Sequence, residues 1–169
     1  MRNHQWLEKQ LDHLLKTYFS DVNLTTPIEI KFGREAKFRF GSIRLVKPKG
    51  YRGVRGLLLL ARLGDKRSFS SNKRSFSSNK KVEPDKSIIT ITSMFAREDV
   101  PVEVVLYTIG HELSHYAHGF SSTNKRMFRH PHHGGIVNAE LTRRGAGHLI
   151  VEFKKWLKGY RKLILESRV

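Results

Sequence analysis

The sequence predicts an α+β fold in which long amphipathic helices surround a small, mostly antiparallel sheet. Apolar residues recur every three or four positions near the start, in the middle and at the end of the 169-residue chain. Between the first two of these segments, short runs alternate apolar and polar residues, as strands with one buried face do. Since 169 residues are about one domain's length, we expect a single domain spanning residues 1–169.

The N-terminal segment has the pattern of an amphipathic helix, which we expect to pack on the central helix. Its apolar positions are Trp6, Leu7, Leu11, Leu14, Leu15, Tyr18 and Phe19. Alternation then predicts two short strands, with apolar residues at Ile28, Ile30 and Phe32 and at Phe38, Phe40, Ile43 and Leu45. Residues 88–92, which are β-branched throughout, predict a third strand. We expect this third strand to form the rim of a cleft and to offer its free edge to an extended peptide.

Two basic segments lie between the second and third strands. Lys47, Lys49, Arg52 and Arg55 alternate with glycines, a composition that allows close approach to phosphates but is equally typical of a flexible turn. Residues 66–72 are then repeated without change in residues 73–79. We interpret residues 64–84 as a flexible basic insertion, because two copies are too few to build a repeat architecture. In the alternative, the repeat's phenylalanines stack on bases while Lys73 and Arg74 contact phosphates.

The central helix is predicted between two terminating signals. Glu98 and Asp99 supply acceptors at its start, Pro101 suits its first turn, and Gly119 suits its end. The apolar residues between these signals follow helical spacing and should form a buried stripe: Val102, Val105, Leu106, Ile109, Leu113 and Tyr116. The helix should therefore be anchored in the core and turn its remaining side chains towards a cleft.

Residues 111–115 read His-Glu-Leu-Ser-His and lie within this helix. Residues four apart project from the same helical face, so His111 and His115 are placed to hold one Zn²⁺ ion. A zinc ion with three protein ligands keeps a position for water and lowers the pKa of that water towards ~7. Glu112 would be the catalytic base that takes the proton. Tyr107 and Tyr116 are candidates for stabilising the developing negative charge, as are basic residues from other loops.

The third metal ligand must come from histidine or a carboxylate, because the chain contains no cysteine. We expect it to be His133, since the intervening chain can turn and bring a second helix back across the motif. His132, His130 and Glu140 remain alternatives, because spacing alone does not rank them. His118 lies two turns beyond His111, about 10.5 Å along the axis, and we expect it at the rim or behind the ligands.

His111-Glu112-x-x-His115, followed by a polar loop and His133-Gly134, resembles the SprT-like zinc metalloproteases, which include the Spartan proteases of DNA–protein crosslinks. The resemblance covers residues 88–141, about a third of the 169-residue chain. It implies a zincin-like core with His111, His115 and His133 as zinc ligands and Glu112 as the base. It also implies hydrolysis of proteins bound to DNA. No four-cysteine zinc ribbon follows, so DNA binding would come from the catalytic domain itself.

The charge of the chain favours a polyanionic partner, which we expect to be DNA. Lysine and arginine number 32 against 15 acidic residues, a net charge of +17. The C-terminal segment predicts a second long amphipathic helix with a basic face. Candidate contacts to nucleic acid are Lys47, Lys49, Arg52, Arg55, Lys73, Arg74, Lys154, Lys155 and Lys158. The alternative to a peptidase is a DNA-binding module whose zinc site is structural or vestigial.

The compartment expected from the sequence is the cytoplasm, with association with the nucleoid as a further expectation. The N-terminal residues lack the apolar run of a signal peptide. The longest wholly apolar stretch, residues 57–61, is too short to cross a bilayer, so we expect no membrane partner.

Overall fold

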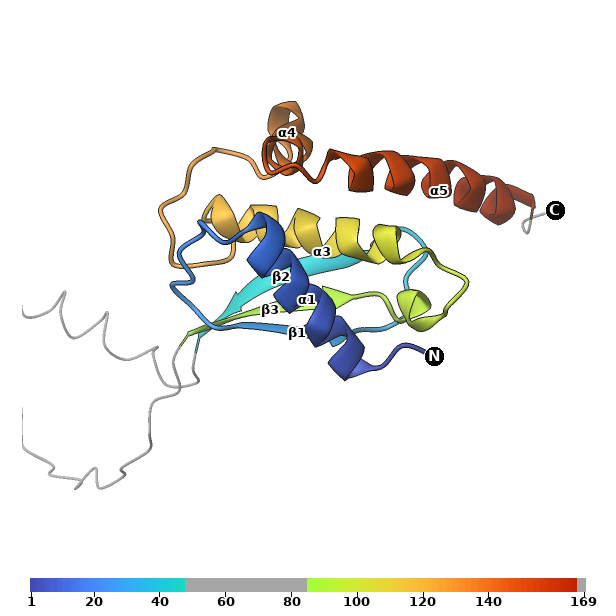
Figure 1. The fold of residues 1–169 in the computed structure, drawn as a ribbon, viewed down its shortest axis with the longest axis horizontal. Coiled ribbons are helices and arrows are strands. Elements are labelled where there is room, and N and C mark those ends of the chain that lie inside the picture. Colours follow the sequence, from blue (N-terminus) through green and yellow to red (C-terminus); the bar gives the residue numbers. More distant parts are fainter. Residues whose placement is uncertain (48–84, 167–169) are drawn as a thin grey trace, which may run out of the picture.

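The computed structural model describes residues 1–47 and 85–166 (Figure 1). Their fold is α+β, as predicted. The elements are α1 (His4–Tyr18), β1 (Ile28–Phe32), β2 (Gly41–Val46), β3 (Lys86–Ile91), η1 (Ser93–Ala96), α3 (Val102–Ala117), η2 (His133–Gly135), α4 (Ile136–Arg143) and α5 (Gly147–Glu166). The insertion expected at residues 64–84, with its repeat, lies outside the described residues. So do Lys49, Arg52, Arg55, Lys73 and Arg74.

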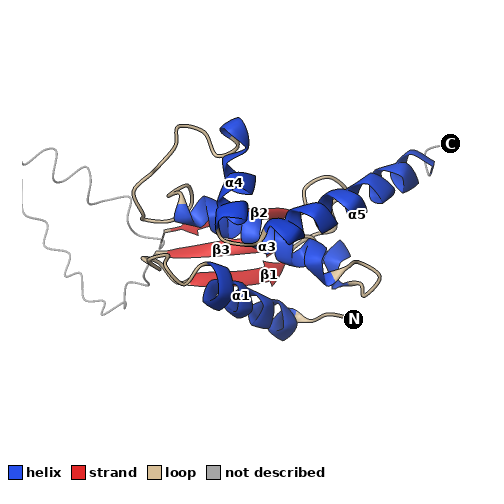
Figure 2. Ribbon diagram, turned by 45° about the horizontal axis from the view of Figure 1, so that its top comes forward, coloured by secondary structure: helices blue, strands red, loops and turns tan. Residues whose placement is uncertain are grey.

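The three strands form a mixed sheet with β3 in the middle (Figure 2). β1 pairs with β3 in parallel and β2 pairs with β3 in antiparallel register, so that Ile30 and Ile43 both lie opposite Ile89. The prediction of a mostly antiparallel sheet is therefore wrong, because one of the two strand pairings is parallel. The expected free edge of β3 is also wrong, because both of its edges are paired. Ile88, Ile89 and Ile91 of β3 are buried, as suits a central strand, and β1 and β2 are the edge strands.

Helices cover the sheet in two layers (Figure 1). α1 packs against β1 and α3, and α3 packs against β2 and β3. α4 and α5 lie on the other side of α3 and contact it along its length. α3 is therefore the central helix, in contact with the sheet on one side and with two helices on the other. Its residues Val105, Ile109 and Leu113 belong to the common core, as the helical spacing predicted.

The signal predicted for the C-terminal end of α3 is confirmed, whereas the capping residues predicted for its N-terminal end are wrong. Pro101 is the N-cap, and neither Glu98 nor Asp99 accepts a capping hydrogen bond from the helix. Glu98 instead pairs with the N-terminal amino group and Asp99 with Arg97. Gly119 does end the helix, with φ at 77°. A Cβ there would lie 2.6 Å from the carbonyl oxygen of Lys125, so only glycine lets the following loop fold back on the helix.

α5 is joined to the body by an aromatic cluster near its middle. Phe40 lies with its ring 5.5 Å from those of Phe95 and Trp156 and 6.0 Å from that of Phe153. The C-terminal end of α5 extends past α3 (Figure 1), and Leu163 is exposed there. Within residues 1–47 and 85–166, no helix combines the length and the apolar character that crossing a bilayer requires.

Substituting Gly119 tests how strongly the following loop is pressed onto α3. Gly119→Ala should lower the free energy of unfolding by about 2 kcal/mol or more, because positive φ costs roughly 1–2 kcal/mol and the Cβ also meets the backbone of Lys125. Gly145→Ala is the matched control, since φ is 81° there and no atom lies within 4 Å of the added carbon. Chemical denaturation measures the free energy of unfolding of both variants. Equal decreases would show that the loop moves away from the added Cβ without losing stability.

Candidate metal centre

α3 carries three of the predicted site residues on one buried face. His111 and His115 are one helical turn apart, and their ring centroids are separated by 4.8 Å. Glu112 and His115 are each only 6% exposed. Because Ile109 and Leu113 on the adjoining face are anchored in the core, the helix cannot rotate these side chains away without exposing apolar surface.

His132 completes the group. Its ring lies 5.4 Å from that of His111 and 4.6 Å from that of His115, centroid to centroid. One potential ligand atom from each of the three histidines lies within 4.8 Å of the others. The rings come from α3 and from the residue just before η2, which are separated in the chain by a long loop. The third member is thus His132, one of the alternatives left open by the sequence.

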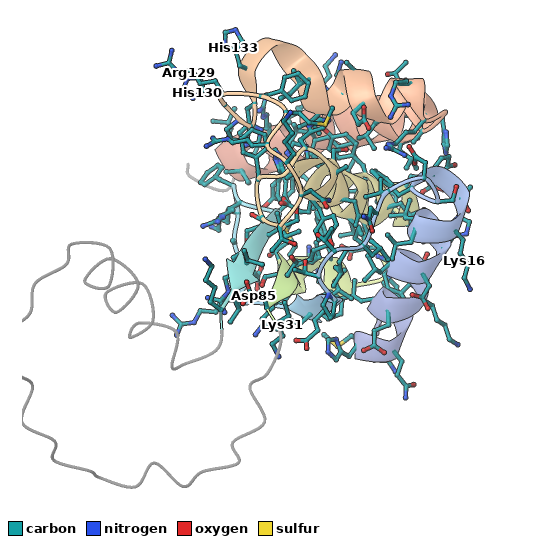
Figure 3. The ribbon with its side chains drawn as sticks, turned by 90° about the vertical axis from the view of Figure 1, so that its left-hand side faces the viewer. Lys16, Lys31, Asp85, Arg129, His130 and His133 are labelled. Atoms are coloured by element: carbon teal, nitrogen blue, oxygen red, sulfur yellow. The ribbon has the colours of Figure 1, made fainter. Side chains whose placement is uncertain are left out.

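The expected third ligand, His133, is not part of this group. His133 and His130 lie at the outer side of the loop, together with Arg129 (Figure 3). They border a separate hollow that they share with Phe128 and Ile136. His133 begins the single turn of η2, and the chain then passes through Gly134 and Gly135, both with positive φ. Both side chains are exposed, but the ring of His132 lies against His111 and His115, whereas His133 lies on the outer side of the loop.

The carboxylate alternative, Glu140, is engaged elsewhere. Its two oxygens accept hydrogen bonds from Arg143 and Arg144 at 2.7 to 3.1 Å. His118, expected at the rim or behind the ligands, is 2% exposed and lies 3.8 Å from the Glu140 carboxylate. His118 is therefore buried near α4 rather than at a rim, and it lies against Glu140 instead of joining the three histidines.

The loop that returns His132 to α3 is fixed at several points. The Met127 backbone N–H donates to the carbonyl of His118, at the end of the helix. Arg126 donates from Nε to the carbonyl of Phe128 at 3.1 Å and from Nη2 to that of Arg129 at 2.8 Å. These bonds close the loop just before Pro131, so the position of His132 is set by the loop's own backbone.

Glu112 lies beneath the edge of β2. Gly41 faces it so closely that a Cβ on Gly41 would lie 2.8 Å from Oε1 of Glu112 and 2.8 Å from Cγ2 of Thr108. The backbone N–H of Ile43 hydrogen-bonds the carboxylate. Gly41 is the first residue of β2, and the absence of a side chain there makes room for the predicted base.

The three histidines and Glu112 open into one pocket with a volume of about 600 Å³. β2 and the residues before it form one wall, and the loop after α3 forms another. Arg39 and Arg126 line this pocket as well. Arg126 lies in a loop whose basic character the sequence revealed, but nothing in the local sequence distinguishes Arg39 from the other cations around it.

Burial controls the protonation of the site. It lowers the pKa of His111 to about 4, with a smaller contribution from His132. Burial, followed by the charges of His111, His132 and His118, lowers the pKa of His115 to about 3. Both imidazoles are therefore neutral at pH 7, which is the form that binds a metal.

The same burial acts in the opposite direction on the carboxylate. It raises the pKa of Glu112 to about 7, against the opposing effects of Arg39 and of the Ile43 backbone hydrogen bond. A carboxyl group with a pKa near neutrality exchanges protons readily at physiological pH.

The donor set fits a zinc ion. Three neutral imidazole nitrogens form a common ligand set for catalytic zinc, with Zn–N distances of about 2.0–2.1 Å. Nδ1 of His115 is buried and has no hydrogen-bond partner in the described part of the chain. Since a buried imidazole nitrogen without a partner is costly, a cation held by these rings would add favourable interactions that the protein alone does not supply.

Neither tyrosine of α3 is free to stabilise a developing charge through its hydroxyl group. The Tyr116 hydroxyl is buried and donates to the carbonyl of Thr26 at 2.9 Å. The Tyr107 hydroxyl donates to Oδ1 of Asn138 at 3.0 Å, although its ring lines the pocket.

The described candidates for nucleic-acid contact are exposed. Lys47 follows β2, and Lys154, Lys155 and Lys158 lie on the outer face of α5. They are apart from the metal-ligating group, so any role in binding a polyanion would be separate from metal binding.

No family model, curated protein or solved structure matches the chain. The functional interpretation of the site therefore depends on its geometry and chemistry.

Comparing His132 with His133 tests the composition of the metal centre. His132→Ala should raise the zinc dissociation constant by at least about 100-fold, because losing a ligand should cost no less than losing a residue that orients one. His133→Ala should leave it within about twofold, since that side chain lies outside the group. Elemental analysis and a competitive chelator measure both. Zinc loss in His133→Ala with retention in His132→Ala would reverse the assignment.

Proposed function

We propose that this protein is a zinc-dependent metallopeptidase with a zincin-like, SprT-like catalytic domain. The observation that carries the proposal is the convergence of His111, His115 and His132 within 4.8 Å, in a pocket that also contains Glu112. A zinc ion bound there would polarise the scissile carbonyl and lower the pKa of a water molecule.

Glu112 is the proposed general base. Its carboxylate lies in the pocket, next in sequence to one ligand and three residues from the other. It would accept the proton of the attacking water and later return it to the leaving amine, as one group can do when its pKa is near the working pH. The pKa of Glu112, raised to about 7 by burial, supports this double role.

The shape of the pocket supports an extended peptide as substrate. β2 is an edge strand, and residues 38–43 in and before it line the pocket. An edge strand can pair with an extended chain through backbone hydrogen bonds. Around Ile43 this edge is already occupied, because its carbonyl accepts from Ser121 and its N–H bonds Glu112. A substrate would therefore pair near Gly41, directly beside the base.

We further propose that the substrates are proteins associated with DNA. The net charge of +17 supports a polyanionic partner. Lys154, Lys155 and Lys158 are exposed on a helix whose opposite face packs near the pocket, so DNA bound along α5 would lie beside the centre.

A DNA-binding module without proteolytic activity is the second candidate function. The observation that favours it is the same exposed basic face of α5, which needs no catalysis to bind phosphates. The two candidates differ in whether zinc and Glu112 are required for the turnover of a protein.

Glu112→Gln tests the peptidase. The variant should keep one zinc per chain and lose at least about 100-fold in turnover, because the amide cannot take up the proton of water. The assay follows cleavage of an unstructured basic protein in the presence of zinc and DNA, with chelated wild type as the inactive control. Undiminished cleavage by Glu112→Gln would remove this residue from the mechanism. If the wild type shows no zinc-dependent cleavage, the DNA-binding module remains as the candidate function.

Replacing Lys154, Lys155 and Lys158 by Gln tests the basic face of α5. If each contacts a phosphate, the slope of log affinity against log salt should become shallower by about 2–3. The control replaces Lys9, Lys16 and Lys31, which are exposed on α1 and β1. The same change in slope in both triple variants would show that only net charge matters. Fluorescence anisotropy with labelled DNA at several salt concentrations measures both.

A further inference from the structure

Most polar groups that line the metal pocket are committed to partners within the protein. The hydroxyl groups of Thr108 and Ser121 donate to backbone carbonyls at 2.9 and 3.2 Å. The Tyr107 hydroxyl donates to the Asn138 side chain. These hydroxyl groups line the pocket, but each already donates its hydrogen bond to the protein. Substrate recognition must therefore depend on other donors.

The positively charged donors among the remaining lining residues are two arginines on different walls. Arg39 lies two residues before the start of β2, and Arg126 belongs to the loop that returns His132 to α3. Arg39 is exposed, and its charge opposes the raised pKa of Glu112, so its guanidinium group lies near that carboxylate. A guanidinium group remains charged at any pH the protein meets and presents a planar fork that matches a carboxylate or a phosphate.

Arg126 is held in position before any ligand arrives. Its Nε and Nη2 atoms donate to the carbonyls of Phe128 and Arg129. Its Cζ lies 4.7 Å from the centroid of Phe120, and the Phe120 ring stands edge-on to His115 at 6.1 Å. Two of the five guanidinium hydrogens are used in these bonds. The remaining donors belong to an exposed side chain that these contacts restrain, which lowers the entropic cost of binding a ligand.

The charges in the pocket are unbalanced. Arg39 and Arg126 stand against a single carboxylate, that of Glu112, and a divalent cation on the histidines would add two more positive charges. Such a surplus favours a ligand with negative charge. The basic face of α5 offers a polyanion its own binding surface, whereas the pocket has aromatic walls from Phe38, Phe40 and Phe153 and a size suited to side chains of a peptide.

We propose that Arg39 and Arg126 form a subsite for a carboxylate group of the peptide substrate, next to the bond at the metal centre. This inference rests on the proposed peptidase function and narrows its substrate class. The carboxylate can come from an acidic side chain near the scissile bond or from the free C-terminus of a peptide. The same fork binds both groups, so the test separates them.

Peptide binding to zinc-loaded Glu112→Gln tests the subsite without requiring turnover. One pair of fluorescent peptides differs only by Glu or Gln at a central position, with an amidated C-terminus. A second pair has no acidic residue and differs only by a free or an amidated C-terminus. In fluorescence anisotropy, the carboxylate should tighten binding by about 10-fold or more in at least one pair, as expected for charge-assisted hydrogen bonds.

Two pairs of variants in the same background show whether the arginines cause this preference. Arg39→Gln and Arg126→Gln should each reduce it to within about twofold. Lys37→Gln and Arg129→Gln are matched controls, because these exposed neighbours lie outside the pocket lining and should keep the preference. Zinc content is measured for every protein. If Arg126→Gln disturbs the loop and loses zinc, the result for Arg39→Gln decides whether the proposal stands, since Arg39 is exposed and lies outside that loop.

Several outcomes overturn the proposal. The first is equal affinity for both members of each peptide pair. The second is a preference for the carboxylate that survives the loss of either arginine. The third is an equal loss of that preference in the control variants, which would indicate a general charge effect. Binding of a single-stranded oligonucleotide that depends on Arg39 and Arg126 more strongly than peptide binding does would assign the subsite to phosphate.

Hydrolysis of peptides by the wild-type protein separates the peptidase proposal from the subsite proposal. Selective binding without cleavage contradicts the peptidase alone, and cleavage without preference contradicts the subsite alone.

Discussion

The close approach of strand β2 to helix α3 is the contact on which the pocket depends. Gly41 has no side chain between the strand and the helix, and a Cβ there would lie 2.8 Å from the Glu112 carboxylate. Glu112 is consequently held under the strand edge, hydrogen-bonded to Ile43 and almost fully buried. That burial raises the pKa of Glu112 to about 7. The absence of a side chain at Gly41 therefore permits the close approach that helps to bury the proposed base.

The parts of the molecule that the sequence predicted are those governed by local periodicity. α1, α3 and α5 follow from apolar residues at helical spacing, and all three strands follow from short β-branched or alternating runs. The pairing of His111 with His115, and the place of Glu112 beside them, follow from helical geometry alone. Gly119 was predictable for the same reason, because the end of a helix favours one residue with positive φ.

The parts that the sequence did not predict depend on contacts between distant segments. His132 and His133 are neighbours in the chain, and the choice between them depends on how the long loop after α3 folds back, which includes the hydrogen bonds of Arg126 to Phe128 and Arg129. No spacing rule captures this direction. The central position of β3 depends likewise on a parallel pairing with β1, which brings together strands more than fifty residues apart in the chain.

Phe153 connects the pocket to the basic face of α5. Its ring stacks on Tyr107 with a centroid separation of 4.1 Å and lines the pocket, while the next two residues, Lys154 and Lys155, are exposed. Successive helical residues are about 100° apart, so a helix that buries Phe153 and Trp156 must turn the intervening lysines outward. These cations are therefore fixed relative to the metal centre by helix packing. A protein attached to a polyanion bound along α5 would be held near the pocket at high effective concentration. Selection by proximity would then need only modest sequence specificity at the scissile bond, which a carboxylate held by two arginines would supply.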